Sequence, residues 1–212
     1  MVKFFQDGGD LMWPLLACAI FGMGVIFWRL AVLTRAGGSS KKVIKALRQA
    51  INEGNIPQAI EVCQNSSGPV AVIMLAGLRR VQRGPETVAK AIENAGTLEM
   101  AFLERGLIWL ATVSTVAPLL GFLGTVIGMV EAFGAIEKAG EVEATLVAGG
   151  IKVALITTVA GLVIAIPMTI FYNYFVTRID ALILDMEESS AHLLDAIEKG
   201  TTAQTTDAGV LI

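Results

Sequence analysis

Two long uncharged runs of this sequence, where little water is expected, contain several hydroxyl side chains. Four of them are candidates for chemistry: Ser114, Thr125, Thr157 and Thr158. In such surroundings a hydroxyl can satisfy a backbone carbonyl, orient a water molecule or hydrogen-bond a carboxyl group. The residues alone therefore leave two interpretations open, an ion-handling role and a purely structural one.

Neither run, 106–130 or 153–177, contains an Asp, Glu or His. A proton relay within a membrane usually needs a titratable group at that depth. The sequence therefore predicts one of two situations. Either the protein moves no ions, or another chain supplies the carboxylate.

Motifs for enzyme chemistry are absent from the sequence. The one histidine, His192, has no metal-binding partner at ligand spacing, and no phosphate-binding loop or nucleophile elbow occurs. Cys18 lies in an apolar run and Cys63 in a polar one, so we expect no disulfide between them. We predict a protein that is not an enzyme and that uses no cofactor and no metal.

Small residues recur at alternating spacings of three and four along 111–132. They are Ala111, Ser114, Pro118, Gly121, Thr125, Gly128 and Ala132. On a helix this spacing gives one narrow face, which favours close approach of a neighbouring helix. A similar stripe follows in the last run, through Ala154, Thr158, Gly161, Ala165 and Thr169. Because a lone copy would expose Gly121 and Gly128 to lipid, we predict a closed homo-oligomeric ring.

The composition indicates an integral membrane protein. Of the 212 residues, 54% are hydrophobic and only 17% are charged, with a mean hydropathy of +0.67. A soluble domain of this size rarely has such a composition. The net charge of -3, without a basic repeat, gives no indication of nucleic-acid binding.

The predicted fold is all-α, with three membrane spans and a helical cytoplasmic extension in one domain over 1–200. The spans are expected at about 11–33, 106–135 and 146–177, because each contains an uncharged run long enough to cross a bilayer. Cytoplasmic helices are expected over 34–105 and 178–199, and a disordered tail over 200–212. Pro57, Pro69 and Pro85 are predicted to start helices. One continuous helix is expected to run from Pro85 through the second span.

Basic residues near the ends of the spans predict the orientation. Many follow the first span, and others precede the second or follow the third, whereas the opposite side carries only Lys3, Lys138 and Lys152. We therefore expect the N-terminus outside the cell and the C-terminus in the cytoplasm.

Three stretches resemble the MotA/TolQ/ExbB proton channel family. They are LERGLIWLATVSTVAPLLGFLGTVIGM (103–129), IKVALITTVAGLVIAIPMTIFYN (151–173) and PVAVIMLAGLRRVQRG (69–84). The resemblance covers about 11–199. Three spans and a short N-terminus make the chain more similar to the ExbB and TolQ branch than to the four-span MotA branch.

The resemblance implies a pentamer around two one-span partner chains of the ExbD or TolR type, whose membrane aspartate carries the ion. It implies a motor in the bacterial inner membrane that energises a periplasm-spanning protein of the TonB or TolA type, for outer-membrane transport or envelope maintenance. Thr125 matches the threonine of the GTVxG motif and Thr158 the last-span threonine, both pore-lining in the family, and Ser114 and Thr157 are assigned to the same pathway. Pro118 and Pro167 match its helix prolines, which join Gly121, Gly128 and Gly161 as packing positions.

One position departs from the family pattern. ExbB-type sequences commonly carry a glutamate where this chain has Val153, and Lys152 precedes it here. The identity of the ion, proton or sodium, is left open by this difference. Two other classes of protein are alternatives: a structural membrane scaffold, and a secondary transporter, which would normally show an inverted repeat that this sequence lacks.

Overall fold

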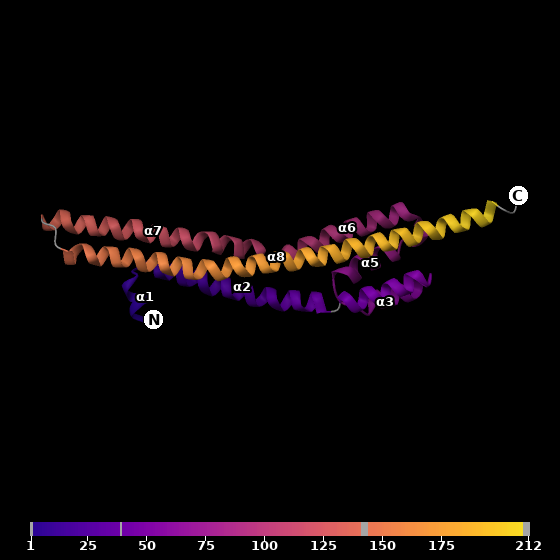
Figure 1. The fold of residues 1–212 in the computed structure, drawn as a ribbon, viewed down its shortest axis with the longest axis horizontal. Coiled ribbons are helices and arrows are strands. Elements are labelled where there is room, and N and C mark those ends of the chain that lie inside the picture. The colour runs from indigo at the N-terminus through magenta and orange to yellow at the C-terminus, as the bar shows by residue number, and fades with distance from the viewer. Residues whose placement is uncertain (1, 39, 141–143, 210–212) are drawn as a thin grey trace. The chain divides into compact units, whose positions relative to one another are not determined.

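The structure, a computed structural model, describes residues 2–38, 40–140 and 144–209. Its helices are α1 (Val2–Asp7), α2 (Met12–Gly38), α3 (Ser40–Asn52), α4 (Ile56–Gln64), α5 (Pro69–Leu78), the 3-10 helix η1 (Val81–Arg83), α6 (Pro85–Glu104), α7 (Leu107–Ala139) and α8 (Ala144–Gly209) (Figure 1). The residues described contain no strand. The prediction of an all-α fold is confirmed.

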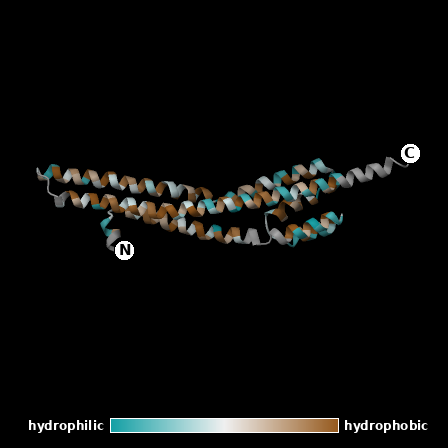
Figure 2. Ribbon diagram, in the orientation of Figure 1, coloured by the Kyte–Doolittle hydropathy of each residue, from teal (hydrophilic) through white to brown (hydrophobic). Residues whose placement is uncertain are grey.

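The chain divides into two compact units. The apolar unit comprises residues 1–29 and 106–175, and the polar unit comprises 30–105 and 176–212. Figure 2 shows α7 and the first half of α8 coloured mainly as hydrophobic, whereas hydrophilic residues are frequent in α3, α6 and the second half of α8. The composition of the apolar unit therefore suits lipid, and that of the polar unit suits water.

Within the described ranges, three helices are long and apolar enough to cross a membrane. Large apolar side chains cover their exposed faces, including Trp13, Phe27, Ile108, Phe122, Leu155 and Val163. Such faces are stable in lipid but costly in water. The chain is therefore a multi-pass membrane protein, as its composition predicts.

In the polar unit, proline starts three helices as predicted. Pro57, Pro69 and Pro85 lie in the first turns of α4, α5 and α6, where the missing N–H would have no intrahelical partner. The second half of α8 packs on this unit through Ile179, Leu182, Met186, Leu193 and Ile197, all buried. An ion pair of 2.6 Å between Arg48 of α3 and Glu188 of α8 joins the same elements.

The prediction of one continuous helix into the second span is wrong. α6 ends at Glu104 and α7 begins at Leu107. Gly106 between them has a left-handed φ of 94°, a conformation that glycine adopts without steric cost. A Cβ at this position would lie 2.8 Å from Cζ3 of Trp28. The glycine thus breaks the helix and admits the indole of α2.

Two other boundaries differ from those expected. The second span, expected to end at about 135, continues as α7 to Ala139, where Gly140 caps the helix in a left-handed conformation. Residues 141–143 lie outside the described residues. The tail predicted to be disordered from Gly200 is helical to Gly209. Residues 201–208 contain neither Gly nor Pro to stop the helix. Residues 210–212 lie outside the described part of the chain.

Candidate ion-pathway site

The backbones of α7 and α8 approach closely through small residues. α7 buries Ala117, Gly121, Gly124, Gly128 and Ala132. A Cβ on Gly128 would lie 2.7 Å from the carbonyl oxygen of Gly150, and a Cβ on Gly161 would lie 2.6 Å from that of Ala117. No larger residue fits at these positions without moving one helix away from the other.

This packing corrects one argument for a ring. The sequence predicts that a lone copy leaves Gly121 and Gly128 exposed to lipid, yet both are buried against α8 of the same chain. The small face of α7 is therefore filled within one chain and does not itself require a second copy. Ring assembly stays a prediction that rests on the family resemblance.

Thr158 joins the two helices. Its hydroxyl donates to the carbonyl oxygen of Gly121 in α7 at 3.2 Å and to that of Ala154 in its own helix at 3.2 Å. The side chain is half-buried. A divided hydrogen bond of this length is weaker than a single linear one, so the hydroxyl can turn towards another partner.

Thr157, which the sequence analysis assigns to the ion pathway, lies in the packed interior between helices. Its side chain is fully buried, and its hydroxyl donates to the carbonyl oxygens of Ala154 at 2.9 Å and Val153 at 3.1 Å. It fills the space beside Gly124, where a Cβ would overlap it. With no exposed surface it cannot line a pathway, so we place Thr157 among the packing residues.

Thr125 and Ser114 lie at the edge of the buried face, and both are half-buried. The hydroxyl of Thr125 donates to the carbonyl oxygen of Phe122 at 2.6 Å, and that of Ser114 donates to Ala111 at 2.8 Å. Each hydroxyl proton is thus engaged, whereas the oxygen keeps lone pairs that can accept a hydrogen bond. These oxygens can therefore accept a hydrogen bond from water or from a protonated carboxyl group.

Helices α7 and α8 each contain an internal proline, Pro118 in α7 and Pro167 in α8. Because proline has no N–H, the carbonyl of Ser114 cannot receive the usual helical bond from Pro118. An additional acceptor therefore lies on the same turn as the Ser114 hydroxyl. The sequence correctly predicts both prolines inside helices. It does not show that the Ser114 hydroxyl beside this carbonyl is half-buried, and this makes the carbonyl relevant to the site.

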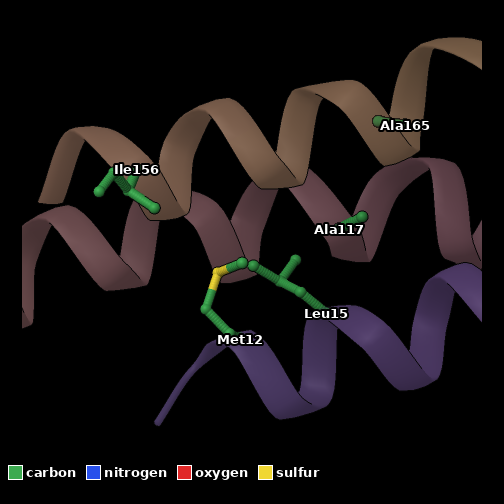
Figure 3. Close-up of a cluster of buried hydrophobic side chains, with 5 residues drawn as sticks. All are labelled: Met12, Leu15, Ala117, Ile156 and Ala165. Carbon is green, nitrogen blue, oxygen red and sulfur yellow. The ribbon is translucent and has the colours of Figure 1, made fainter. Parts of the chain in front are cut away.

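The first span is fixed to the other two by a small apolar cluster. Figure 3 shows Met12 and Leu15 of α2 facing Ala117 of α7 and Ile156 and Ala165 of α8, all buried. Sequence reasoning missed this role of α2, because its apolar residues are spread around the helix and no position stands out. Among the described residues, no cluster of three His, Cys, Asp or Glu could hold a metal ion.

Comparison with known proteins gives consistent matches. The model of the MotA/TolQ/ExbB proton channel family matches residues 65–188. Biopolymer transport protein exbB1 of Vibrio cholerae is 30% identical over 166 residues, which are 76% of this chain and 73% of that protein. The Tol-Pal system protein TolQ of Haemophilus influenzae is 39% identical over 102 residues, 46% of this chain and 45% of TolQ.

An ExbB homolog of Methanothermobacter thermautotrophicus, named for biopolymer transport, is 32% identical over 181 residues. The match takes in 85% of this chain but 64% of that relative. The chain thus spans somewhat less than two thirds of the length of this relative.

Proposed function

This chain belongs to the MotA/TolQ/ExbB proton channel family, and we propose that it is the ring-forming subunit of an ion-driven motor in the bacterial inner membrane. In this proposal five copies surround two one-span partner chains of the ExbD or TolR type, each of which carries a membrane aspartate. The complex energises a periplasm-spanning protein of the TonB or TolA type, for outer-membrane transport or envelope maintenance.

The observation that carries the proposal is the pair Thr125 and Thr158. Thr158 bonds to the carbonyl of Gly121, and Gly121 lies one helical turn, about 6 Å, before Thr125. Both hydroxyls therefore lie at a similar depth. Both are half-buried and both donate their proton to a backbone carbonyl. We propose that the two oxygens act together as an acceptor pair in an apolar surrounding.

An acceptor pair is complementary to a protonated carboxyl group more than to a carboxylate, because two acceptors repel. The spans of this chain contain no acid between 107 and 130 or between 153 and 175. The carboxyl group would therefore come from a partner chain. We propose that the threonines stabilise its protonated form as the ion passes.

Reconstitution tests the proposal. Proteoliposomes would hold this chain alone, or this chain with a one-span partner that carries a membrane aspartate, and an internal pH dye would report flux under an imposed potential. We expect flux only with both chains, and its loss when the partner's aspartate is changed to asparagine. Equal flux without the partner, or none from the assembled complex, would contradict the proposal.

The ring itself is tested by native mass spectrometry in mild detergent, where a pentamer is expected. A stable monomer or dimer would contradict ring assembly.

The periplasmic N-terminus is proposed from the basic residues near the ends of the spans. Cysteine labelling tests this orientation separately.

A structural scaffold is the second candidate, and one observation favours it. Each of the four hydroxyls hydrogen-bonds to a backbone carbonyl, as residues that only support packing would do. The flux measurement in proteoliposomes distinguishes the two functions. A scaffold would assemble with its partner and stay impermeable, whereas the motor subunit would conduct.

A further inference from the structure

We infer that residues 5–12 form a strap that holds α8 at Lys152, Val153 and Ile156, closed by an ion pair between Asp7 and Lys152. Oδ2 of Asp7 and Nζ of Lys152 are 2.6 Å apart, although 145 positions separate the residues in sequence. The pair thus fixes the N-terminal helix α1 to the third apolar helix within the apolar unit.

The ion pair alone is a weak connection. Its side chains are 41% and 58% exposed, and exposed pairs contribute little in water. A strap therefore needs more than this pair, and two glycines leave room for its backbone to run close to α8. A Cβ on Gly8 would lie 3.0 Å from Cγ2 of Ile156, and one on Gly9 would lie 3.6 Å from Cγ1 of Val153.

The two glycines also direct the chain back onto α8. Gly9 has a φ of +69°, which side-chain-bearing residues rarely adopt. A Cβ on Gly8 would also lie 2.6 Å from Cγ of Met12. Glycine at both positions allows the turn between α1 and α2 to lie flat against its neighbours.

An aromatic contact anchors the other end of the strap. Phe5 is partly buried against the cluster that contains Met12 and Ile156. Its ring also meets that of Trp13 edge-on, with centroids 5.3 Å apart. Apolar packing at Phe5 and the charge pair at Asp7 therefore both hold one short helix.

The strap contacts α8 directly before its two threonines. Lys152, Val153 and Ile156 precede Thr157 and Thr158 in the same helix. By fixing this part of α8, the strap positions Thr158 opposite the Gly121 carbonyl, and Asp7 and Lys152 are positioning residues. Any effect on ion flux rests on the proposed function, whereas the strap itself does not.

Distance measurements between spin labels test the strap directly. Labels would be placed on the exposed positions Gln6→Cys and Ala148→Cys, in the full chain with its two native cysteines replaced by serine, in lipid nanodiscs. We expect one narrow distance distribution. Asp7→Asn or Lys152→Gln should raise the open population by about two- to fivefold, the effect of losing one exposed ion pair.

Matched variants decide the outcome. Asp10→Asn removes an exposed acid from the same turn and should leave the distribution unchanged. The exchange Asp7→Lys with Lys152→Asp should restore the narrow distribution, and Phe5→Ala should broaden it independently. Unchanged distributions in both single charge variants, or an exchange that fails to restore closure, would overturn the inference. Because no flux is measured, failure of the strap and failure of the proposed function are distinguishable.

Discussion

The hydroxyl of Thr158 in α8 donates a hydrogen bond to the backbone carbonyl of Gly121 in α7, at 3.2 Å. This approach depends on the absence of a side chain, because a Cβ on Gly121 would lie 3.1 Å from Cα of Thr158. The residue with the strongest indication of an ion-handling role thus also connects two spans. A test of its function must separate these roles.

Thr158→Val should leave folding and complex assembly near normal and sharply reduce ion-coupled work. Valine keeps the shape but offers neither donor nor acceptor. The lost interhelical bond should cost only about 0.6 kcal/mol. The measurements are complementation of a deletion strain and size-exclusion chromatography of the complex. Thr158→Ser, which keeps the hydroxyl, should retain partial function.

Thr169→Val is the matched control, because Thr169 lies in α8 and bonds to Ala165 of the same helix at 3.0 Å. It should leave activity and assembly unchanged. Normal activity in Thr158→Val would remove the hydroxyl from the mechanism, and loss of assembly would favour a packing role.

Thr125→Val should reduce ion flux less than Thr158→Val does. Its hydroxyl bonds only within α7, to Phe122 at 2.6 Å, so its loss should not weaken the contact between α7 and α8. Flux and thermal stability would be measured on the same preparation. A fall in stability larger than that of Thr158→Val would contradict the placement of Thr125 at the edge of the interface.

Gly128→Ala should destabilise the chain itself rather than only the ring. The added Cβ would meet the Gly150 carbonyl oxygen at 2.7 Å, and backbone atoms cannot turn aside as a flexible side chain can. Gly134→Ala is the control in the same helix, because a Cβ there has no neighbour within 4 Å. That change should be neutral or stabilising by up to about 1 kcal/mol. Thermal unfolding in detergent measures both, and equal melting temperatures would contradict the packing.

Cysteine labelling tests the proposed orientation. Glu137→Cys, near the end of α7, and Glu187→Cys, in the polar half of α8, are both exposed positions. In a background without the native cysteines, a membrane-impermeant maleimide should label the first in intact spheroplasts. The second should react only after the membrane is opened. The reverse pattern would overturn the orientation.

Burial raises the pKa of the Cys63 thiol from 9.0 to about 11. In the unfolded chain the thiol ionises near pH 9, whereas in the folded chain it stays protonated. Between these values the unfolded state binds fewer protons, so stability falls as pH rises from about 9 to about 11. Thermal unfolding across this range should show a steeper decline in the native chain than in Cys63→Ala. Equal slopes would contradict the burial of Cys63.

Local patterns in the sequence determined much of the fold. The three spans follow from the length and hydropathy of single runs, because a membrane requires continuous apolar helices. The starts of α4, α5 and α6 follow from Pro57, Pro69 and Pro85, whose effect extends over one turn. The lack of an acid in the spans likewise needs no tertiary information. It predicts that the protein moves no ions or that another chain supplies the carboxylate.

Only the tertiary structure decided which face of α7 is buried and what fills it. Large and small apolar residues occur on every face of α7, so their periodicity does not predict which of Gly124 and Thr125 is buried. In the structure Gly124 is buried and Thr125 lies at the edge of the buried face. Gly106, where the helix breaks, lies against an indole of α2, and the strap depends on a charge pair 145 positions apart. Contacts between segments so distant in sequence leave no local pattern, because each partner is chosen by the packing of the whole unit.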